Sequence, residues 1–352
     1  SILKDLRSAE KFIFMEYFII GSGVMLDQIL DILKEKVKHG VVVRIIYDDF
    51  GSINAIPPHF IKEMESIGIQ TRRFNPYKPM LSVIMNDRDH RKILVIDGRV
   101  AHTGGYNIAD EYINKKIRFG YWKDAGIRVE GECVNSFTTM FLEMWNYINK
   151  DNAVHDEYLN PHNTFSQSEK SGFVQPFCDS PLEHDDVGEN LYVSIISRAK
   201  KYVYIFTPYL ILGTELSHAM ISAARSGVDV RIVVPKIPDK KLIYLQTKAN
   251  FRPLIEAGVR IYLYTPGFIH SKCIVADDDT AIVGTCNLDF RSMYWNFEDF
   301  VYMYRTQCIG KIKEDAIETF AVSEEVYEES TNDISFAGRL LQSILQLFAP
   351  LL

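Results

Sequence analysis

An internal duplication constrains the fold of this chain more than any other feature of its sequence. Residues 90–97 read HRKILVID and residues 270–277 read HSKCIVAD, so each segment has a histidine, a lysine two positions later and an aspartate five positions after that. Similar segments also precede both triplets, in three pairs: 8–20 with 198–211, 37–49 with 224–236, and 64–76 with 254–266. A repeat of this extent indicates two copies of one structural unit.

Each copy has the pattern of an α/β domain. Runs of aromatic and β-branched residues, typical of buried strands, alternate with helix ends that stop at a glycine such as Gly40 or Gly227. This alternation predicts a mixed, mostly parallel sheet flanked by helices in each half. The polar stretch after residue 150 breaks the pattern, so we expect a first domain at 1–150, a connector at 151–190 and a second domain at 191–352.

The composition limits the classes of function. The 352 residues are 47% hydrophobic and carry a net charge of −7, which fits a globular protein and disfavours an extended nucleic-acid surface. Five cysteines without a Cys-x-x-Cys spacing disfavour a zinc site or a disulfide framework and favour reduced thiols facing the cytosol. The sequence has no apolar run long enough to cross a bilayer, and it begins with Ser1, so we expect a processed chain that lacks an upstream segment.

The triplets place ionisable groups beside strands that are otherwise apolar. His90 and Lys92 adjoin the apolar run 93–96 and, two residues apart, face the same side of a strand; His270 and Lys272 have the same spacing. Burying such side chains costs free energy unless they are paired or used.

A turn follows each triplet at the same spacing, GGYN at 104–107 and GTCN at 284–287. Glycine allows backbone N–H groups to approach a ligand, and Asn107 and Asn287 add amide donors. Together with the lysines these groups predict two cradles suited to phosphate oxygens.

These paired motifs closely resemble those of the phospholipase D superfamily, over essentially the whole chain. Within that superfamily several segments resemble the bacterial cardiolipin synthases: FIFMEYFII, GGYNIADEY, WKDAGIRVEG, NLDFRSMYWNFE and LFAPLL. The resemblance implies two similar α/β domains related by a pseudo-twofold axis, with both triplets in one site. Two histidines are then available for covalent catalysis, one as the nucleophile and one as the general acid and base.

The resemblance also implies roles for individual residues. The symmetric triplets leave the choice of nucleophile open, and the family pattern implies His90 as nucleophile and His270 as acid. It further implies that Asp124 orients His90 and that Glu298 orients His270. The phosphate would be held by Lys92, Lys272, Asn107 and Asn287, while the remaining motif residues would be structural: Asp97, Asp277, Gly104, Gly105, Gly284 and Thr285. No metal or cofactor is expected.

Four other features allow two interpretations each. Glu16 either ends an exposed strand or lines a head-group pocket, and His102 is either a packed loop residue or close to the site. The apolar segment 77–87 is either core packing or a lip that admits lipid chains. The C-terminal segment 336–352 predicts an apolar helix that either docks on the core or binds a membrane surface.

The expected function is transfer of a phosphatidyl group between two molecules of phosphatidylglycerol, which gives cardiolipin and glycerol. The alternatives are a hydrolase of the same superfamily, acting on phospholipid or nucleic acid, and an inactive membrane-binding scaffold. The expected partners are an anionic phospholipid and a membrane surface, with no nucleic acid, and the expected location is the cell membrane with the catalytic part facing the cytosol. The sequence leaves the oligomeric state, the second lipid donor and the acyl preference open.

Overall fold

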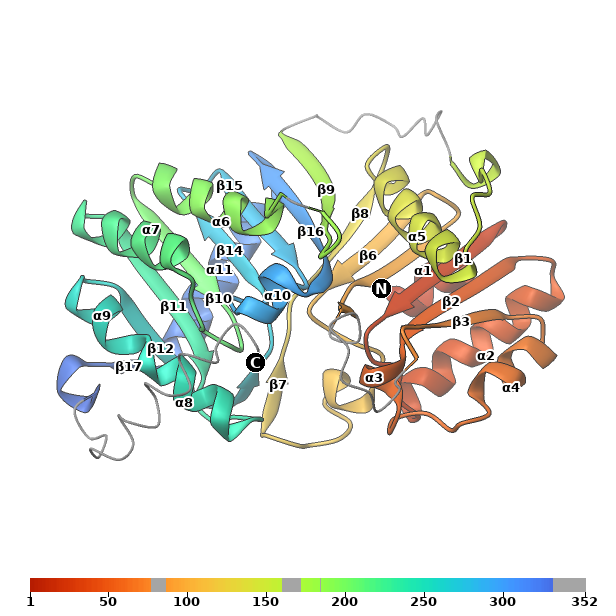
Figure 1. Ribbon diagram of the computed structural model, residues 1–352, viewed down its shortest axis with the longest axis horizontal. Helices are drawn as coiled ribbons and strands as arrows, with labels where there is room; N and C mark the ends of the chain where they lie inside the picture. Colours follow the sequence, from red (N-terminus) through yellow and green to blue (C-terminus); the bar gives the residue numbers. More distant parts are fainter. Residues whose placement is uncertain (77–86, 160–171, 184, 332–352) are drawn as a thin grey trace.

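Two similar α/β halves lie side by side in the computed structural model, which describes residues 1–76, 87–159, 172–183 and 185–331 (Figure 1). The first half contains, in chain order, α1 (Ile2–Arg7), β1 (Phe12–Tyr17), α2 (Val24–Lys38), β2 (Val42–Asp48), α3 (Asp49–Ser52), α4 (Phe60–Ser66), β3 (Gln70–Phe74), β4 (Arg88–Asp89), β5 (Lys92–Ile96), β6 (Val100–Gly104), the 3-10 helix η2 (Asp110–Ile113), β7 (Tyr121–Lys123), β8 (Gly126–Glu130), α5 (Val134–Asn149) and the 3-10 helix η3 (Asp156–Tyr158).

The second half follows a similar succession of elements and adds β9 at its start and β17 near its end. It contains β9 (Phe173–Asp179), α6 (Val187–Arg198), β10 (Tyr202–Phe206), α7 (Thr214–Arg225), β11 (Asp229–Pro235), α8 (Lys241–Ala249), α9 (Phe251–Glu256), β12 (Arg260–Tyr264), β13 (Gly267–Ile269), β14 (Cys273–Ala276), β15 (Thr280–Gly284), α10 (Phe290–Tyr294), β16 (Asn296–Tyr304), α11 (Cys308–Ala321), β17 (Ser323–Val326) and the 3-10 helix η4 (Glu328–Thr331).

Each half is built around a mixed sheet. The first sheet has the order β3-β2-β1-β5-β6-β8, and the second contains the corresponding order β12-β11-β10-β14-β15-β16. Parallel pairing joins β1, β2 and β3 in one sheet and β10, β11 and β12 in the other, while the strands that follow pair antiparallel. The sheets are mixed as expected, but parallel pairs do not predominate, because each triplet strand begins an antiparallel hairpin that needs no crossover helix.

The triplet aspartates fix the far end of these hairpins. Asp97 accepts hydrogen bonds from the backbone N–H groups of Glu10, Lys11 and Phe12 at 2.8 Å. Asp277 accepts the equivalent bonds from residues 200–202 at 2.7–3.1 Å. Both aspartates have a left-handed backbone, with φ of 54° and 52°, as expected for turn residues. These bonds tie each hairpin to the first strand of its sheet, which agrees with the structural role expected of both aspartates.

Helices cover both outer faces and fill the junction between the halves. α2 and α4 pack their apolar residues on one face of the first sheet, and α6 and α7 do so on the second. α5 and α11 contribute to a third apolar cluster that continues from the first sheet to the second. The halves therefore share a buried core.

Two short strands also cross the boundary between the halves. β4 pairs in parallel with β16 of the second sheet, and β7 pairs in parallel with β13. β9, from the region predicted as a connector, pairs antiparallel with β16 over residues 173–179. This strand lies within the predicted connector but belongs to the second sheet. The domain limits at 150 and 190 remain a prediction. The segment 77–86 of the predicted lip and the predicted C-terminal helix at 336–352 lie outside the described residues.

Candidate active site

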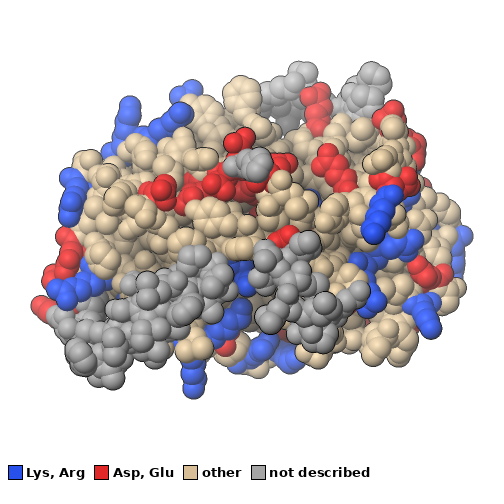
Figure 2. Space-filling view, in the orientation of Figure 1, with Lys and Arg blue, Asp and Glu red and all other residues tan. Residues whose placement is uncertain are grey.

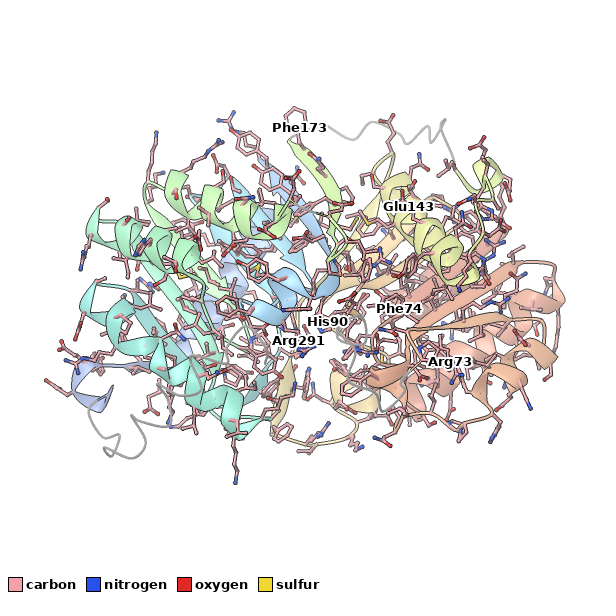
Figure 3. The ribbon with its side chains drawn as sticks, viewed as in Figure 1. Arg73, Phe74, His90, Glu143, Phe173 and Arg291 are labelled. Carbon is pink, nitrogen blue, oxygen red and sulfur yellow. The ribbon has the colours of Figure 1, made fainter. Side chains whose placement is uncertain are left out.

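Both triplets lie at the edge of their sheet where the parallel strands end. The backbone of Lys92 is in register with Tyr17, the last residue of β1, and Cys273 is in register with Phe206, the last residue of β10. Ligand sites of α/β sheets commonly form at this carboxyl edge of the strands. Figure 3 shows His90 at the junction of the two halves, close to Arg291 of α10.

The carboxylate partners of the histidines are exchanged relative to expectation. His90 Nδ1 lies 2.9 Å from both carboxylate oxygens of Glu298, and His270 Nδ1 lies 2.8 Å from Asp124 Oδ2. The predicted pairs, Asp124 with His90 and Glu298 with His270, are therefore wrong. Each histidine takes its carboxylate from the other half of the chain, so neither half holds a complete pair.

The strands that cross between the halves explain this exchange. Asp89 of β4 is in register with Phe297 of β16, and the N–H of His90 donates to the carbonyl of Phe297 at 2.9 Å, which places Glu298 beside the ring of His90. In the same way β7 aligns with β13, and the N–H of His270 donates to the carbonyl of Lys123 at 2.7 Å. Asp124 follows directly and reaches His270.

The two lysines are fully buried beside their histidines. Lys92 Nζ donates to the backbone carbonyl of His90 at 2.5 Å. Lys272 Nζ donates to the carbonyl of His270 at 2.7 Å and lies 2.8 Å from its Nε2. Burial lowers the pKa of Lys92 to about 8 and that of Lys272 to about 7. The predicted proximity of histidine and lysine within each triplet is confirmed.

Burial also sets the protonation of the histidines and their partners. It holds the pKa of His90 well below its ordinary value, and together with the charge of Lys272 it lowers the pKa of His270 to about 4. It raises the pKa of Glu298 to about 7. Burial opposes the ionisation of Asp124 as well, but the charge and hydrogen bond of His270 outweigh it and the pKa of Asp124 is lowered. The two pairs thus share a geometry and differ in the ease with which their carboxylates ionise.

In the two glycine turns, backbone N–H groups form hydrogen bonds with backbone carbonyls of the protein itself. Gly105 N–H donates to the carbonyl of Ala125 at 2.9 Å, and Thr285 N–H donates to the carbonyl of Asp299 at 3.0 Å. A Cβ on Gly105 would lie 2.1 Å from Asp124 Oδ1, and one on Gly284 would lie 2.5 Å from the carbonyl of Asp299. The expectation that the N–H groups of Gly105 and Thr285 are free for a ligand is wrong, because both are bonded to backbone carbonyls. The missing side chains of Gly105 and Gly284 leave space for a neighbouring segment of the chain. Gly104, with a φ of 150°, is crowded in the same way by the carbonyl of Ala125.

The two motif asparagines have different surroundings. Asn107 Oδ1 accepts from the N–H of Ile19 at 2.9 Å, and its Nδ2 donates to the hydroxyl of Tyr112 at 2.7 Å. One amide hydrogen of Asn107 therefore remains for a phosphate. Asn287 Oδ1 is buried and has no hydrogen-bond partner among the described residues. Phosphate binding by either side chain stays a prediction.

Several neighbours of the site were not predicted. Aromatic rings line both histidines: the ring centroid of Phe18 lies 5.0 Å from that of His90, and those of Tyr112 and Trp122 lie 5.6 and 5.3 Å from that of His270. Trp122 stands two residues before the recognised Asp124 in the sequence WKD, and this spacing could have indicated that it lies near the site.

Further groups fix Glu298 and Lys92. Asn296 Nδ2 donates to Glu298 Oε1 at 3.0 Å, the hydroxyl of Thr285 donates to Oε2, and Asp299 Oδ1 accepts from the N–H of Lys92 at 3.0 Å. Asp299 directly follows Glu298 in the sequence, and this position next to a recognised motif residue could have indicated that Asp299 lies near the site. The predicted structural role of Thr285 agrees with its contact to Glu298.

Other side chains occupy definite places. Glu16 is fully buried and pairs with Arg91, so it is not at an exposed strand end, and the interpretation as a pocket residue finds no contact with the triplet side chains. His102 is packed on β6 with its Nε2 2.8 Å from Asp5 Oδ2, away from the site. Cys273 and Cys286 are buried core residues, and all five cysteines are free.

Comparison with known proteins places the chain in a family. The family described as "Cardiolipin synthase, PLD-like domain" matches residues 2–145 and 192–320, one stretch in each half. The chain belongs to this family. The family match therefore follows the same division into two halves that the sheets show, and a site assembled from both triplets is consistent with it.

Individual relatives cover the whole chain. It is 39% identical over 352 residues to a cardiolipin synthase of Alkalihalophilus pseudofirmus, covering 100% of this chain and 69% of that protein. It is 49% identical over 349 residues to an uncharacterized protein of Streptococcus mutans, covering 99% and 75%. Among solved structures, phosphatidylserine synthase of Haemophilus influenzae superposes with a TM-score of 0.72 at 16% identity, covering 99% of this chain and 90% of that one, which supports the fold.

No helix in the described part of the chain is both long and apolar enough to cross a bilayer.

Proposed function

We propose that the chain is a phosphatidyltransferase that joins two molecules of phosphatidylglycerol, giving cardiolipin and glycerol. The single observation that carries the proposal is the crossed arrangement of two histidine–carboxylate pairs, His90 with Glu298 and His270 with Asp124. Two oriented imidazoles provide both a nucleophile and an acid, and a phosphodiester needs both for exchange through a covalent intermediate.

The electrostatics support His90 as the nucleophile. A nucleophilic imidazole must be neutral, and burial lowers the pKa of both His90 and His270, so the difference between the two lies in their carboxylates. Glu298 adds little fixed charge, since burial raises its pKa to about 7. Asp124, with its lowered pKa, remains anionic and stabilises an imidazolium at His270 better. A bound phosphodiester offsets the charges of Lys92 and Lys272, which favours protonation of His270.

The reaction then proceeds in two balanced steps. Nε2 of His90 attacks phosphorus while the bond to the glycerol oxygen breaks, and His270 gives its proton to the departing glycerol. The free hydroxyl of a second phosphatidylglycerol then gives its proton to His270 and attacks the phosphohistidine, which breaks the N–P bond and restores His90. Lys92 and Lys272 hold the charged phosphoryl oxygens throughout, with Asn107 and Asn287 as further donors. Transfer exceeds hydrolysis where lipid alcohol is concentrated and water is excluded.

Support for a lipid substrate comes from the relatives, several of which are named cardiolipin synthases, including those of Alkalihalophilus pseudofirmus and Geobacillus kaustophilus. A lipid substrate implies that the partners are anionic phospholipid and a membrane surface. It also implies a location at the cell membrane, with the site facing the cytosol. The net charge of −7 agrees with a substrate other than nucleic acid.

Product analysis with phosphatidylglycerol vesicles tests the proposal. The chain should release glycerol and cardiolipin in equal amounts, and both His90→Ala and His270→Ala should abolish both products. His102→Ala, which alters a buried histidine remote from the site, serves as the control and should retain activity in the folded fraction. Phosphatidic acid as the main product would replace the transferase with a hydrolase. Full synthesis by either catalytic variant would contradict the shared two-histidine site.

A further inference from the structure

The edge of the molecule that carries the site also carries a short loop with an unusual surface. Residues 114–121 read NKKIRFGY and join η2 to β7, and this loop lies at the lower edge of Figure 1. Ile117, near its middle, is 81% exposed, and Tyr121 is 58% exposed. Lys115, Lys116 and Arg118 surround the isoleucine, and the loop contains no carboxylate. Exposure of a large aliphatic side chain among cations is typical of surfaces that meet anionic lipid.

The loop is held in shape at its base. Asn114 Nδ2 donates to the carbonyl of Trp122 at 3.0 Å, and Asn114 Oδ1 accepts from the N–H of Trp122 at 2.7 Å. Asn114 and Gly120 have left-handed backbones, with φ of 56° and 80°, which turn the chain at both ends. Exposure of Ile117 is therefore built into the loop's conformation, because these clamps keep its side chain away from the core.

The base of the loop is also a wall of the catalytic site. Trp122, which Asn114 clamps, lies 5.3 Å from the ring of His270, and Phe119 packs on Phe268 of the second half at 5.8 Å. Any surface that binds this loop therefore lies on the same side of the molecule as His270.

Neighbouring segments continue this surface. Residues 236–242 follow β11 at the same edge and place Ile237 and Leu242 outward, 43% and 57% exposed, beside three lysines and one aspartate. Lys115, Lys116 and Lys241 have no ion-pair partner among the side chains that the structure describes. In Figure 2, Lys and Arg side chains project at the middle of this lower edge, as they also do at the upper left and on the right, whereas Asp and Glu gather across the middle of the upper part. The two segments together hold six cations and one carboxylate in a chain with net charge −7.

We propose that the 114–121 loop docks the protein on a bilayer rich in anionic phospholipid, with Ile117 inserted among the acyl chains and the lysines against the lipid phosphates. Residues 236–242, at the same edge, form a second support. This inference rests on the proposed function, because it names the surface through which lipid reaches the histidines. Insertion of the tip and charge attraction act together, since each alone binds weakly.

Sedimentation with vesicles tests the docking without turnover. Ile117→Ser should lower partition about tenfold on vesicles of equal phosphatidylglycerol and phosphatidylcholine. Lys115→Gln with Lys116→Gln should lower partition about fivefold for each lysine on these vesicles and leave the weak binding to pure phosphatidylcholine unchanged.

Matched controls lie at the opposite edge. Phe173 is 73% exposed at the start of β9, at the top of Figure 3, and Lys200 and Lys201 precede β10. Phe173→Ser and the pair Lys200→Gln with Lys201→Gln should bind like the parent chain. Unchanged partition of the loop variants, or an equal loss in the controls, would overturn the inference.

Turnover separates this inference from the proposed function. On monomeric short-chain phosphatidylglycerol the loop variants should equal the parent chain, while on vesicles they should lose activity in proportion to partition. Loss on the monomeric substrate as well would overturn a docking role and show a catalytic one. A parent chain that produces no cardiolipin from either substrate would overturn the proposed function, and the sedimentation result would still decide the docking.

Discussion

At the scale of single residues, the site is defined by which carboxylate each histidine meets. Glu298 holds Nδ1 of His90 and Asp124 holds Nδ1 of His270, while Lys272 Nζ lies 2.8 Å from Nε2 of His270. Burial lowers the pKa of both imidazoles, and the charges of Lys92 and Lys272 lower it further, so both rings are neutral in the free protein. The two histidine–carboxylate pairs therefore have the same geometry, but the pKa of Asp124 is lowered and that of Glu298 is raised.

Substituting the two carboxylates separately should slow different steps. Asp124→Asn and Glu298→Gln should each lower kcat by about 10²–10⁴-fold with little change in KM, because the imidazole loses its orientation and favoured tautomer. With a p-nitrophenyl phosphatidyl ester, whose leaving group needs no proton, the burst of nitrophenolate should survive in Asp124→Asn and be lost in Glu298→Gln. Stopped-flow absorbance measures the burst. Equal bursts in both variants would contradict the crossed assignment.

The buried lysines should make phosphate binding sensitive to pH. Their pKa values, about 8 for Lys92 and about 7 for Lys272, lie below the ordinary lysine value, so both lose their protons at lower pH than usual. Dimethyl phosphate keeps one negative charge throughout, and its affinity should fall as pH rises from about 6 to about 9. Calorimetric titration measures this affinity. A constant affinity over that interval would show that the lysines do not hold the phosphoryl oxygens.

At the scale of elements, the turns after β6 and β15 bring segments together. Gly105 leaves room for Asp124, and the carbonyl of His270 lies 2.8 Å from the place where a Cβ would stand. The close approach of these segments is what allows a carboxylate in one half to reach a histidine in the other.

Gly105→Ala should therefore impair the His270 pair. The added methyl group should displace Asp124, lower the free energy of unfolding by about 1–3 kcal/mol and reduce cardiolipin synthesis. Gly310→Ala is the matched control, because Gly310 lies in α11 with nothing within 4 Å of an added Cβ. The control should be as stable as the parent chain or slightly more stable. Normal activity of the Gly105 variant would mean that the close approach is not required.

Much of this arrangement of elements was predictable from the sequence. The repeated strands and the glycine stops depend on local patterns, and the structure confirms them, while the hydrogen bonds of Asp97 and Asp277 agree with their expected structural role. The exchange of Asp124 and Glu298 was not predictable, because symmetric triplets say nothing of which half supplies a partner more than a hundred residues away. The sequence left two interpretations of Glu16 open for a similar reason, since its partner Arg91 is distant in sequence, and burial excludes the exposed strand end.

At the scale of the whole molecule, the two halves share one buried core. The apolar cluster around α5 and α11 contains buried residues of both sheets, and β4 and β7 each pair with a strand of the other half. Separating the halves would expose this cluster and leave the buried charges at 298 and 124 without their histidines, at a large cost in free energy.

A single cooperative unfolding transition should follow. Scanning calorimetry should give one peak whose van't Hoff and calorimetric enthalpies agree, because the shared core prevents one half from unfolding alone. Two separated peaks, or an isolated fragment of residues 1–150 that folds cooperatively, would contradict the shared core.

Locating the covalent intermediate tests the central claim most directly. The His270→Ala variant, given the p-nitrophenyl phosphatidyl ester and quenched, should accumulate a phosphatidyl group on His90, because the first step needs no acid and the second lacks its base. Peptide mass spectrometry identifies the modified residue, and His90→Ala should show no adduct. An adduct on His270 in the His90→Ala variant would reverse the two roles, and the absence of an adduct from every variant would contradict a covalent mechanism.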